Sequence, residues 1–145
     1  HHTAPVNDLY ALHESLVMLR EEGLEAAHRR QQQNHQALVA GLEAMGLAMA
    51  EAPDYRLPQL NSVLIPEGVD DAEVRSTLLR EFDLEIGAGL GALAGKTWRI
   101  GLMGFASNER HVTTCLNALD AVLGRQGAAI NTGAALDAAQ AVFRG

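Results

Sequence analysis

The chain has 145 residues, of which 48% are hydrophobic and 20% charged, and its formal net charge is −7. This composition suits a folded domain with its own core. The acidic balance, without a cluster of lysine and arginine, argues against nucleic-acid binding. No apolar stretch approaches the length of a membrane span.

The chain ends and the single cysteine bear on location. The sequence begins at His1 without an initiator methionine, as expected of a processed chain or a piece of a longer one. No secretory signal is visible, and the C-terminal Phe143-Arg144-Gly145 lacks a peroxisomal address. Cys115 cannot form an internal disulfide, which fits a reducing compartment. We therefore expect a cytoplasmic location.

The first third of the chain is predicted to be helical. Pro5 should keep residues 1–6 extended, and Asn7 can cap a helix. The helical spacing of four leucines predicts one apolar stripe on it: Leu9, Leu12, Leu16 and Leu19. After Gly23, a second helix is predicted over 24–45, with Gly46 as its C′ residue. Its polar middle, 29–36, is typical of a solvated face or of a segment that crosses between domains.

The remainder alternates short strands with helices. Strands are predicted over 47–50, 59–65, 84–86 and 97–103, with a glycine-rich loop over 87–95. One helix should begin at Asp70 or Asp71, with Val74, Leu78, Leu79 and Phe82 inward. A second should run from Asn108 to Leu123, with Val112, Cys115, Leu116 and Leu119 inward, and an alanine-rich helix should span 134–143. This order predicts the α+β class: a small antiparallel or mixed sheet covered by helices and preceded by long helices.

Several short motifs have simpler interpretations than a cofactor or metal site. The G-x-G-x-x-A pattern over 87–92 should open a helix if it bound a dinucleotide, but a strand is predicted after it. Gly95-Lys96-Thr97 lacks the glycine that a P-loop needs five residues earlier. His1 and His2 point opposite ways if extended and have no third ligand in view, so no metal site is expected.

Other reactive side chains are predicted to be structural. Cys115 falls within a helical pattern, which favours a buried apolar role over a nucleophilic one. His13, His28, His35 and His111 are expected to be surface or half-buried helix residues.

Arg99 is the strongest candidate for a functional side chain. It alternates with Trp98 and Ile100, so it should share a strand face with Gly101 and Met103. A partly buried guanidinium needs an anionic partner, and it pairs best with a carboxylate through two parallel hydrogen bonds. That partner is a bound ligand or, equally, an internal aspartate or glutamate.

Runs at separated positions resemble one family of enzymes. His1-His2-Thr3-Ala4-Pro5-Val6 is similar to the HHT-x-P-V segment of alanine–glyoxylate and serine–glyoxylate aminotransferases. The likeness continues at 12–16, 22–25, 56–58, 85–86 and 89–91. The run Gly95-Lys96-Thr97-Trp98-Arg99-Ile100-Gly101-Leu102-Met103-Gly104 is similar to the family's G-K-x-x-R-I-G-L-x-G strand. The order and spacing of these runs make the resemblance specific as far as about Leu123.

The resemblance implies the C-terminal portion of a class V, fold-type I enzyme that uses pyridoxal 5′-phosphate (PLP). It implies that 1–22 form an interdomain segment and helix that contact the cofactor phosphate and the dimer partner, and that 23–145 form the small C-terminal domain. The large PLP-binding domain is then absent from this chain. Arg99 would bind the substrate carboxylate, and Thr3 would contact the cofactor phosphate of the neighbouring subunit. The partners implied are an amino acid, a 2-oxo acid, a second subunit and the large domain.

The resemblance also implies that the chain alone is inactive. Family members hold PLP as a Schiff base on a lysine upstream of HHT, whereas the only lysine here, Lys96, matches a different position. We therefore expect no catalytic residue in this chain. The intact enzyme would move an amino group from alanine or serine to glyoxylate or a similar 2-oxo acid.

Two alternatives stay open. The chain could be a non-catalytic binding or dimerisation module that uses the leucine stripe, or part of another class V enzyme. A desulfurase is disfavoured because it needs a mobile cysteine, and Cys115 is predicted in a helix.

Overall fold

The computed structural model describes residues 3–145 and divides the chain into two compact units, His1–Arg30 and Gln31–Gly145. His1 and His2 lie outside the described residues, and with them most of the proposed HHT motif and the discounted histidine pair. The predicted domain boundary between residues 22 and 23 stays a prediction. Each unit is described by itself.

The first unit holds helix α1 (Val6–Glu22) and the first turns of helix α2 (Leu24–Ala44). Helix α1 begins directly after Pro5, so the predicted Asn7 cap is wrong. Pro5 occupies the N-cap position with a φ of −76°, and its side chain offers no hydrogen-bond acceptor to the first amides of the helix. The leucine stripe is exposed within this unit, with Leu9, Leu12 and Leu16 between 52% and 56% exposed. Gly23 separates the two helices with a φ of 84°, as predicted.

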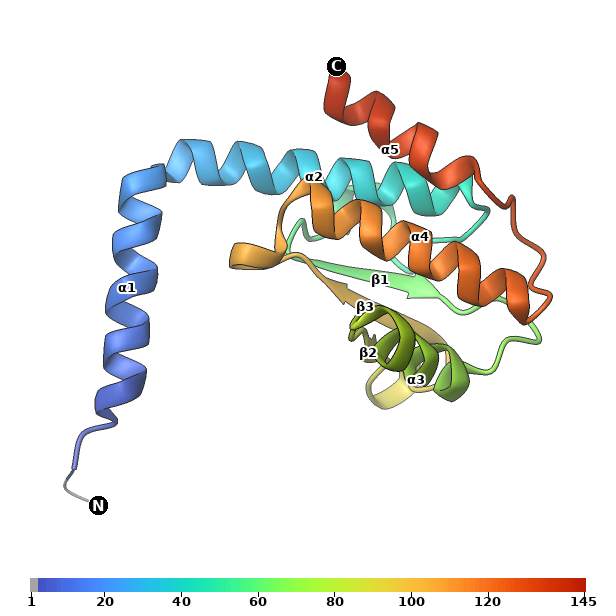
Figure 1. The fold of residues 1–145 in the computed structure, drawn as a ribbon, viewed down its shortest axis with the longest axis horizontal. Helices are drawn as coiled ribbons and strands as arrows, with labels where there is room; N and C mark the ends of the chain where they lie inside the picture. Colours follow the sequence, from blue (N-terminus) through green and yellow to red (C-terminus); the bar gives the residue numbers. More distant parts are fainter. Residues whose placement is uncertain (1–2) are drawn as a thin grey trace. The chain divides into compact units, whose positions relative to one another are not determined.

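The second unit is built on a three-stranded antiparallel sheet (Figure 1). Its strands are β1 (Leu60–Leu64), β2 (Gly87–Ala88) and β3 (Thr97–Gly101), in the order β1-β3-β2. Strand β3 is therefore central and pairs with both neighbours, with Arg99 opposite Ser62 on one side and Gly87 on the other. This arrangement confirms the α+β prediction.

Two predicted strands are wrong. Residues 47–50 make only one isolated bridge, from Met49 to Val63. The strand predicted at 84–86 lies instead at Gly87–Ala88, inside the predicted glycine-rich loop. Leu84 and Ile86 are apolar because they pack on the core, and that signal resembled the pattern of a strand.

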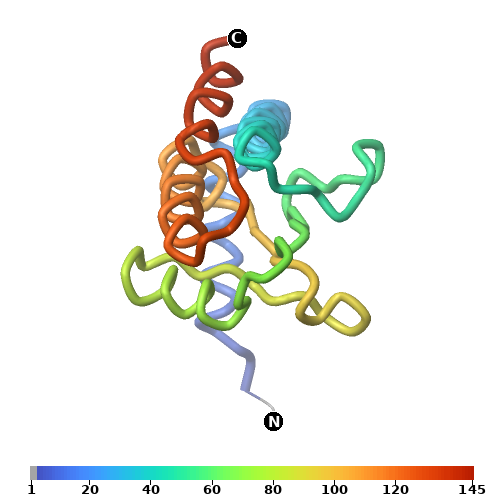
Figure 2. The backbone as a smooth tube through the Cα atoms, turned by 90° about the vertical axis from the view of Figure 1, so that its right-hand side faces the viewer, coloured from blue at the N-terminus to red at the C-terminus, as the bar shows by residue number. Residues whose placement is uncertain are grey.

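Helices α2, α3 (Asp71–Phe82) and α4 (Glu109–Arg125) gather on one side of the sheet, and α5 (Ala134–Arg144) packs along α4 (Figures 1 and 2). The sheet face toward them is apolar, with Val63 and Trp98 fully buried and Ile100 nearly so. Short 3₁₀ turns occupy Pro53–Tyr55, Gly91–Leu93 and Gly104–Ala106. The core is the space between these helices and this face.

The helix starts mostly follow the predicted capping residues. Asp70 accepts a hydrogen bond from the Glu73 amide and Asn108 from the His111 amide. The inward residues of α4 are buried as predicted, but Leu79 of α3 is 52% exposed and Thr77 is buried in its place. The predicted Gly46 stop is confirmed by its φ of 94°.

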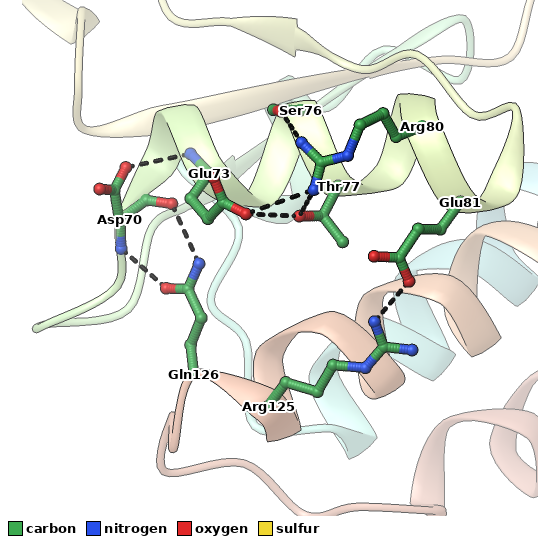
Figure 3. A network of polar contacts seen from close by, with 8 residues as sticks. All are labelled: Asp70, Glu73, Ser76, Thr77, Arg80, Glu81, Arg125 and Gln126. Carbon is green, nitrogen blue, oxygen red and sulfur yellow. Dashed lines mark hydrogen bonds and ion pairs between the residues drawn. The ribbon is translucent and has the colours of Figure 1, made fainter.

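Exposed polar side chains connect α3 to the end of α4 (Figure 3). Arg125 forms an ion pair with Glu81, and Gln126 accepts a hydrogen bond from the Asp70 amide. Arg80 contacts Ser76, Thr77 and Glu73 along α3 itself. Because the Arg125–Glu81 and Arg80–Glu73 ion pairs are solvated, we assign them a minor structural role. Within residues 3–145, no helix has the length and hydropathy needed to cross a membrane.

Candidate functional site

The candidate site is built on the sheet face that lies away from the helices. Strand alternation places Arg99 and Gly101 on this face, while Trp98 and Ile100 point into the core. Arg99 is half-buried and lies between Ser62 of β1 and Gly87 of β2. The predicted sharing of one strand face by Arg99 and Gly101 is thus found in the fold, whereas Met103 lies beyond the end of β3.

The Arg99 guanidinium is held by one side only. Its Nε donates to the carbonyl oxygen of Ala88 at 2.8 Å. The would-be Cβ of Gly87 would lie 3.2 Å from Nη2, which shows that this nitrogen lies close above the glycine. Within residues 3–145 the terminal nitrogens Nη1 and Nη2 have no hydrogen-bond acceptor, which leaves them for a planar anion, the geometry in which arginine grips a carboxylate with two bonds.

The alternative of an internal ion pair is not found. Among residues 3–145, five ion pairs join arginine to aspartate or glutamate, and Arg99 belongs to none of them. Its one hydrogen bond goes to a neutral carbonyl. A half-buried cation without an internal counter-ion is a strong indication of an external anion.

The opposite face of the same strands carries a buried polar network that the sequence analysis missed. His35 Nδ1 is 2.7 Å from Asn61 Oδ1, and Asn61 also donates to the Ile100 carbonyl at 3.4 Å. Asn34 donates to Ser107 at 3.2 Å. The polar middle of α2 is therefore partly buried, and His35, at 7% exposed, is neither a surface nor a half-buried residue. The His35–Asn61 bond fixes α2 against β1, and the Asn61–Ile100 bond ties β1 to β3, the strand that carries Arg99.

A cavity of about 470 Å³ lies on the core side, between residues 82–86, the end of β3 and the first half of α4. Ile100 and Cys115 line it, but Arg99 does not. Burial raises the pKa of the Cys115 thiol to about 12, so at neutral pH it is an unreactive, protonated group. The predicted apolar role of Cys115 agrees with its position in the core.

The other candidate residues lie on other segments of the chain. Thr3 belongs to the first unit and is exposed there. Lys96 is exposed directly before β3. The described residues contain no group of three histidine, cysteine or acidic side chains that could hold a metal ion. The G-x-G-x-x-A segment opens only a three-residue turn, Gly91–Leu93, which does not give a dinucleotide the helix N-terminus it needs.

Comparisons with known proteins find several aminotransferases, although no protein-family profile matches the chain. The chain is 43% identical over 143 residues to (S)-ureidoglycine–glyoxylate transaminase of Bacillus subtilis, covering 99% of this chain and 34% of the relative. The solved structure of that B. subtilis enzyme superposes with a TM-score of 0.91, covering 94% of this chain and 35% of the other. The homologues of this chain are aminotransferases.

Two further aminotransferases show the same relation. Alanine–glyoxylate aminotransferase of Callithrix jacchus is 40% identical over 120 residues, covering 82% of this chain and 29% of the relative. Pyridoxamine–pyruvate aminotransferase of Mesorhizobium loti superposes with a TM-score of 0.93 at 29% identity, covering 98% of this chain and 36% of the other. The chain thus spans about a third of the length of these aminotransferases.

Proposed function

We propose that this chain is the substrate-carboxylate-binding part of a class V, PLP-dependent aminotransferase that moves an amino group from alanine or serine to glyoxylate. The observation that carries the proposal is the Arg99 guanidinium, tied through Nε to a backbone carbonyl and without an internal counter-ion in residues 3–145. The homologues support the reaction class, since two of the three relatives above carry glyoxylate in their names.

Arg99 would act by positioning. Two parallel bonds would fix the position and plane of the substrate carboxylate, and with the amino group also held in the site the Cα–H bond would keep one direction. Strand β3 is the central strand and is anchored from below by Trp98 and Ile100, so the guanidinium rests on a rigid support. The same grip serves the amino donor and the 2-oxo acceptor, because both carry a carboxylate next to the reacting carbon.

The residues of this chain fit the substrate and not the cofactor. PLP supplies an electron sink for amino transfer and needs a lysine amine of lowered pKa, whereas Lys96 is an exposed side chain outside the Arg99 face. We place the cofactor lysine and most phosphate ligands outside this chain, with Thr3 contributing to the phosphate of a neighbouring subunit. A cytoplasmic location remains part of the proposal.

Replacing Arg99 tests this function. In the aminotransferase that contains this chain, Arg99→Ala should lower kcat/KM for alanine and glyoxylate by about 100- to 1,000-fold, because a truncated charge pair should cost about 3–4 kcal/mol here. Arg99→Lys should recover only part of this, since an ammonium lacks the planar fork. Steady-state kinetics with alanine, serine and glyoxylate measure the loss, and unchanged kinetics would remove Arg99 from the site.

The exposed leucine stripe on α1 supports a homodimer. Three leucines of α1 are each more than half exposed, which implies that a second protein surface packs on them. Helix α1 has no buried residue, and such a helix is only marginally stable in water. Leu12→Glu with Leu16→Glu should shift the protein from dimer to monomer in sedimentation velocity. The control Glu14→Lys with Glu21→Lys changes charge on the other face of α1 and should leave the dimer intact. Equal behaviour of the two pairs would refute the dimer role of the stripe.

A further inference from the structure

We propose that Gly87 is a positioning residue for the substrate carboxylate, because a side chain at this position would press on the Arg99 guanidinium that lies against strand β2. This inference rests on the proposed function and adds a second residue to its site. It concerns a glycine that neither motif nor spacing singles out on its own.

The packing around Gly87 gives the first argument. Gly87 of β2 is paired with Arg99 of β3. The two residues therefore lie side by side on the open face of the sheet. A Cβ at position 87 would lie 3.2 Å from Arg99 Nη2 and 3.5 Å from Arg99 Cζ and Cβ. The first distance is closer than ordinary van der Waals contact, so the guanidinium would have to move.

The backbone gives the second argument. Many glycines of this chain have a positive φ that other residues avoid, but Gly87 does not. Its backbone therefore accepts alanine without strain, and what a side chain would disturb is the space above it. The atom disturbed is Nη2, one of the two nitrogens left free when Nε bonds the Ala88 carbonyl.

A side chain at position 87 should therefore weaken the binding of carboxylates in particular, an effect that a general loss of stability would not produce. Displacing Nη2 by a few tenths of an ångström weakens one of the two parallel bonds to a carboxylate and leaves the charge in place. A misplacement of about 1 Å can cost roughly 100-fold in rate, so a smaller shift should cost on the order of 10-fold. The loss should fall on ligands that carry a carboxylate and spare those that carry an amide.

The experiment compares Gly87 with a glycine outside the site. Gly124 lies in α4, has no positive φ, and its added Cβ would meet nothing within 4 Å. Gly87→Ala, Gly124→Ala and Arg99→Ala are made in the aminotransferase that contains this chain. The readouts are the inhibition constants of propionate and propionamide, which cannot undergo amino transfer, and KM and kcat for alanine.

We expect Gly87→Ala to weaken propionate about 10-fold and to raise KM for alanine similarly, with propionamide unchanged. Gly124→Ala should match the unmodified enzyme in all readouts. If Arg99→Ala weakens propionate while Gly87→Ala binds it as tightly as Gly124→Ala does, the role of Gly87 is overturned and the proposed function stands. If Arg99→Ala leaves propionate binding unchanged, the proposed function itself fails, and the role of Gly87 fails with it.

A double variant keeps the test valid if Gly87→Ala folds poorly. Lysine at position 99 has no Nη2, so the added methyl group meets no terminal nitrogen. Adding Gly87→Ala to Arg99→Lys should therefore change neither propionate binding nor the melting temperature relative to Arg99→Lys alone. An equal loss in both backgrounds would show that Gly87 serves the sheet and not the guanidinium.

Discussion

At the scale of single residues, Cys115 links burial to pH dependence. Burial raises the pKa of its thiol from 9.0 to about 12, so the folded state retains the proton while the unfolded state loses it. The stability that the neutral thiol contributes is complete below pH 9.0 and is lost as the pH rises toward 12, by at most about 1.4 kcal/mol per pH unit. Cys115→Ala should cost roughly 1 kcal/mol at neutral pH, and this cost should shrink above pH 9.0. Urea unfolding of both proteins across this range measures it, and a constant difference would contradict a buried thiol.

The roles of single residues could be predicted from the sequence to different extents. Arg99 was predictable, because a charge within an apolar strand conflicts with burial unless it meets an anion. His35 was not, since its neighbours are polar and its partner Asn61 lies 26 residues away. Gly87 was noticed only as part of a discounted nucleotide motif. Its significance depends on the register that sets it opposite Arg99, and register is a property of the folded sheet.

At the scale of secondary-structure elements, α3 and β3 are joined by one charged hydrogen bond. Asp71 Oδ1 accepts from Trp98 Nε1 at 2.8 Å and from Arg75 Nε at 2.8 Å. The Arg75 guanidinium and, after it, the indole N–H hold the pKa of Asp71 below its usual value. Asp71 therefore contributes stability that is present above the normal carboxyl range and is lost as the pH falls through the lowered pKa.

A double-mutant cycle of Asp71→Ala and Trp98→Phe should give a coupling of about 1–2 kcal/mol at neutral pH, because the bond involves an ionised partner. The coupling should fall in acid. The exposed pair Glu81–Arg125, which joins α3 to α4 (Figure 3), is the control and should give below about 1 kcal/mol. Urea unfolding followed by circular dichroism measures both cycles, and equal couplings would show that burial of the indole adds nothing.

The elements themselves were predicted unevenly. The bounds of α2 to α5 could be read closely from apolar spacing, helped by the capping residues Asp70 and Asn108 of α3 and α4 and by the Gly46 stop after α2. Strand β2 could not, because a two-residue strand of Gly87 and Ala88 has no apolar alternation to detect. It exists through its pairing with β3, which is a long-range contact that local pattern does not encode.

At the scale of the second unit, Gly41 decides how closely three helices pack. A Cβ at Gly41 of α2 would lie only 2.8 Å from Leu116 Cδ2 of α4, closer still to Leu116 Cδ1, and 3.0 Å from the Ala135 carbonyl of α5. Gly41→Ala should therefore destabilise the protein by about 1–3 kcal/mol through overpacking, although alanine favours the helix itself.

Gly124→Ala in α4 is the matched control, since nothing lies within 4 Å of its added Cβ. It should stabilise by up to about 1 kcal/mol through helix propensity. Thermal unfolding of the two variants should therefore show shifts of opposite sign. Two stabilising shifts would mean that the helices separate easily and that the core does not depend on this close approach.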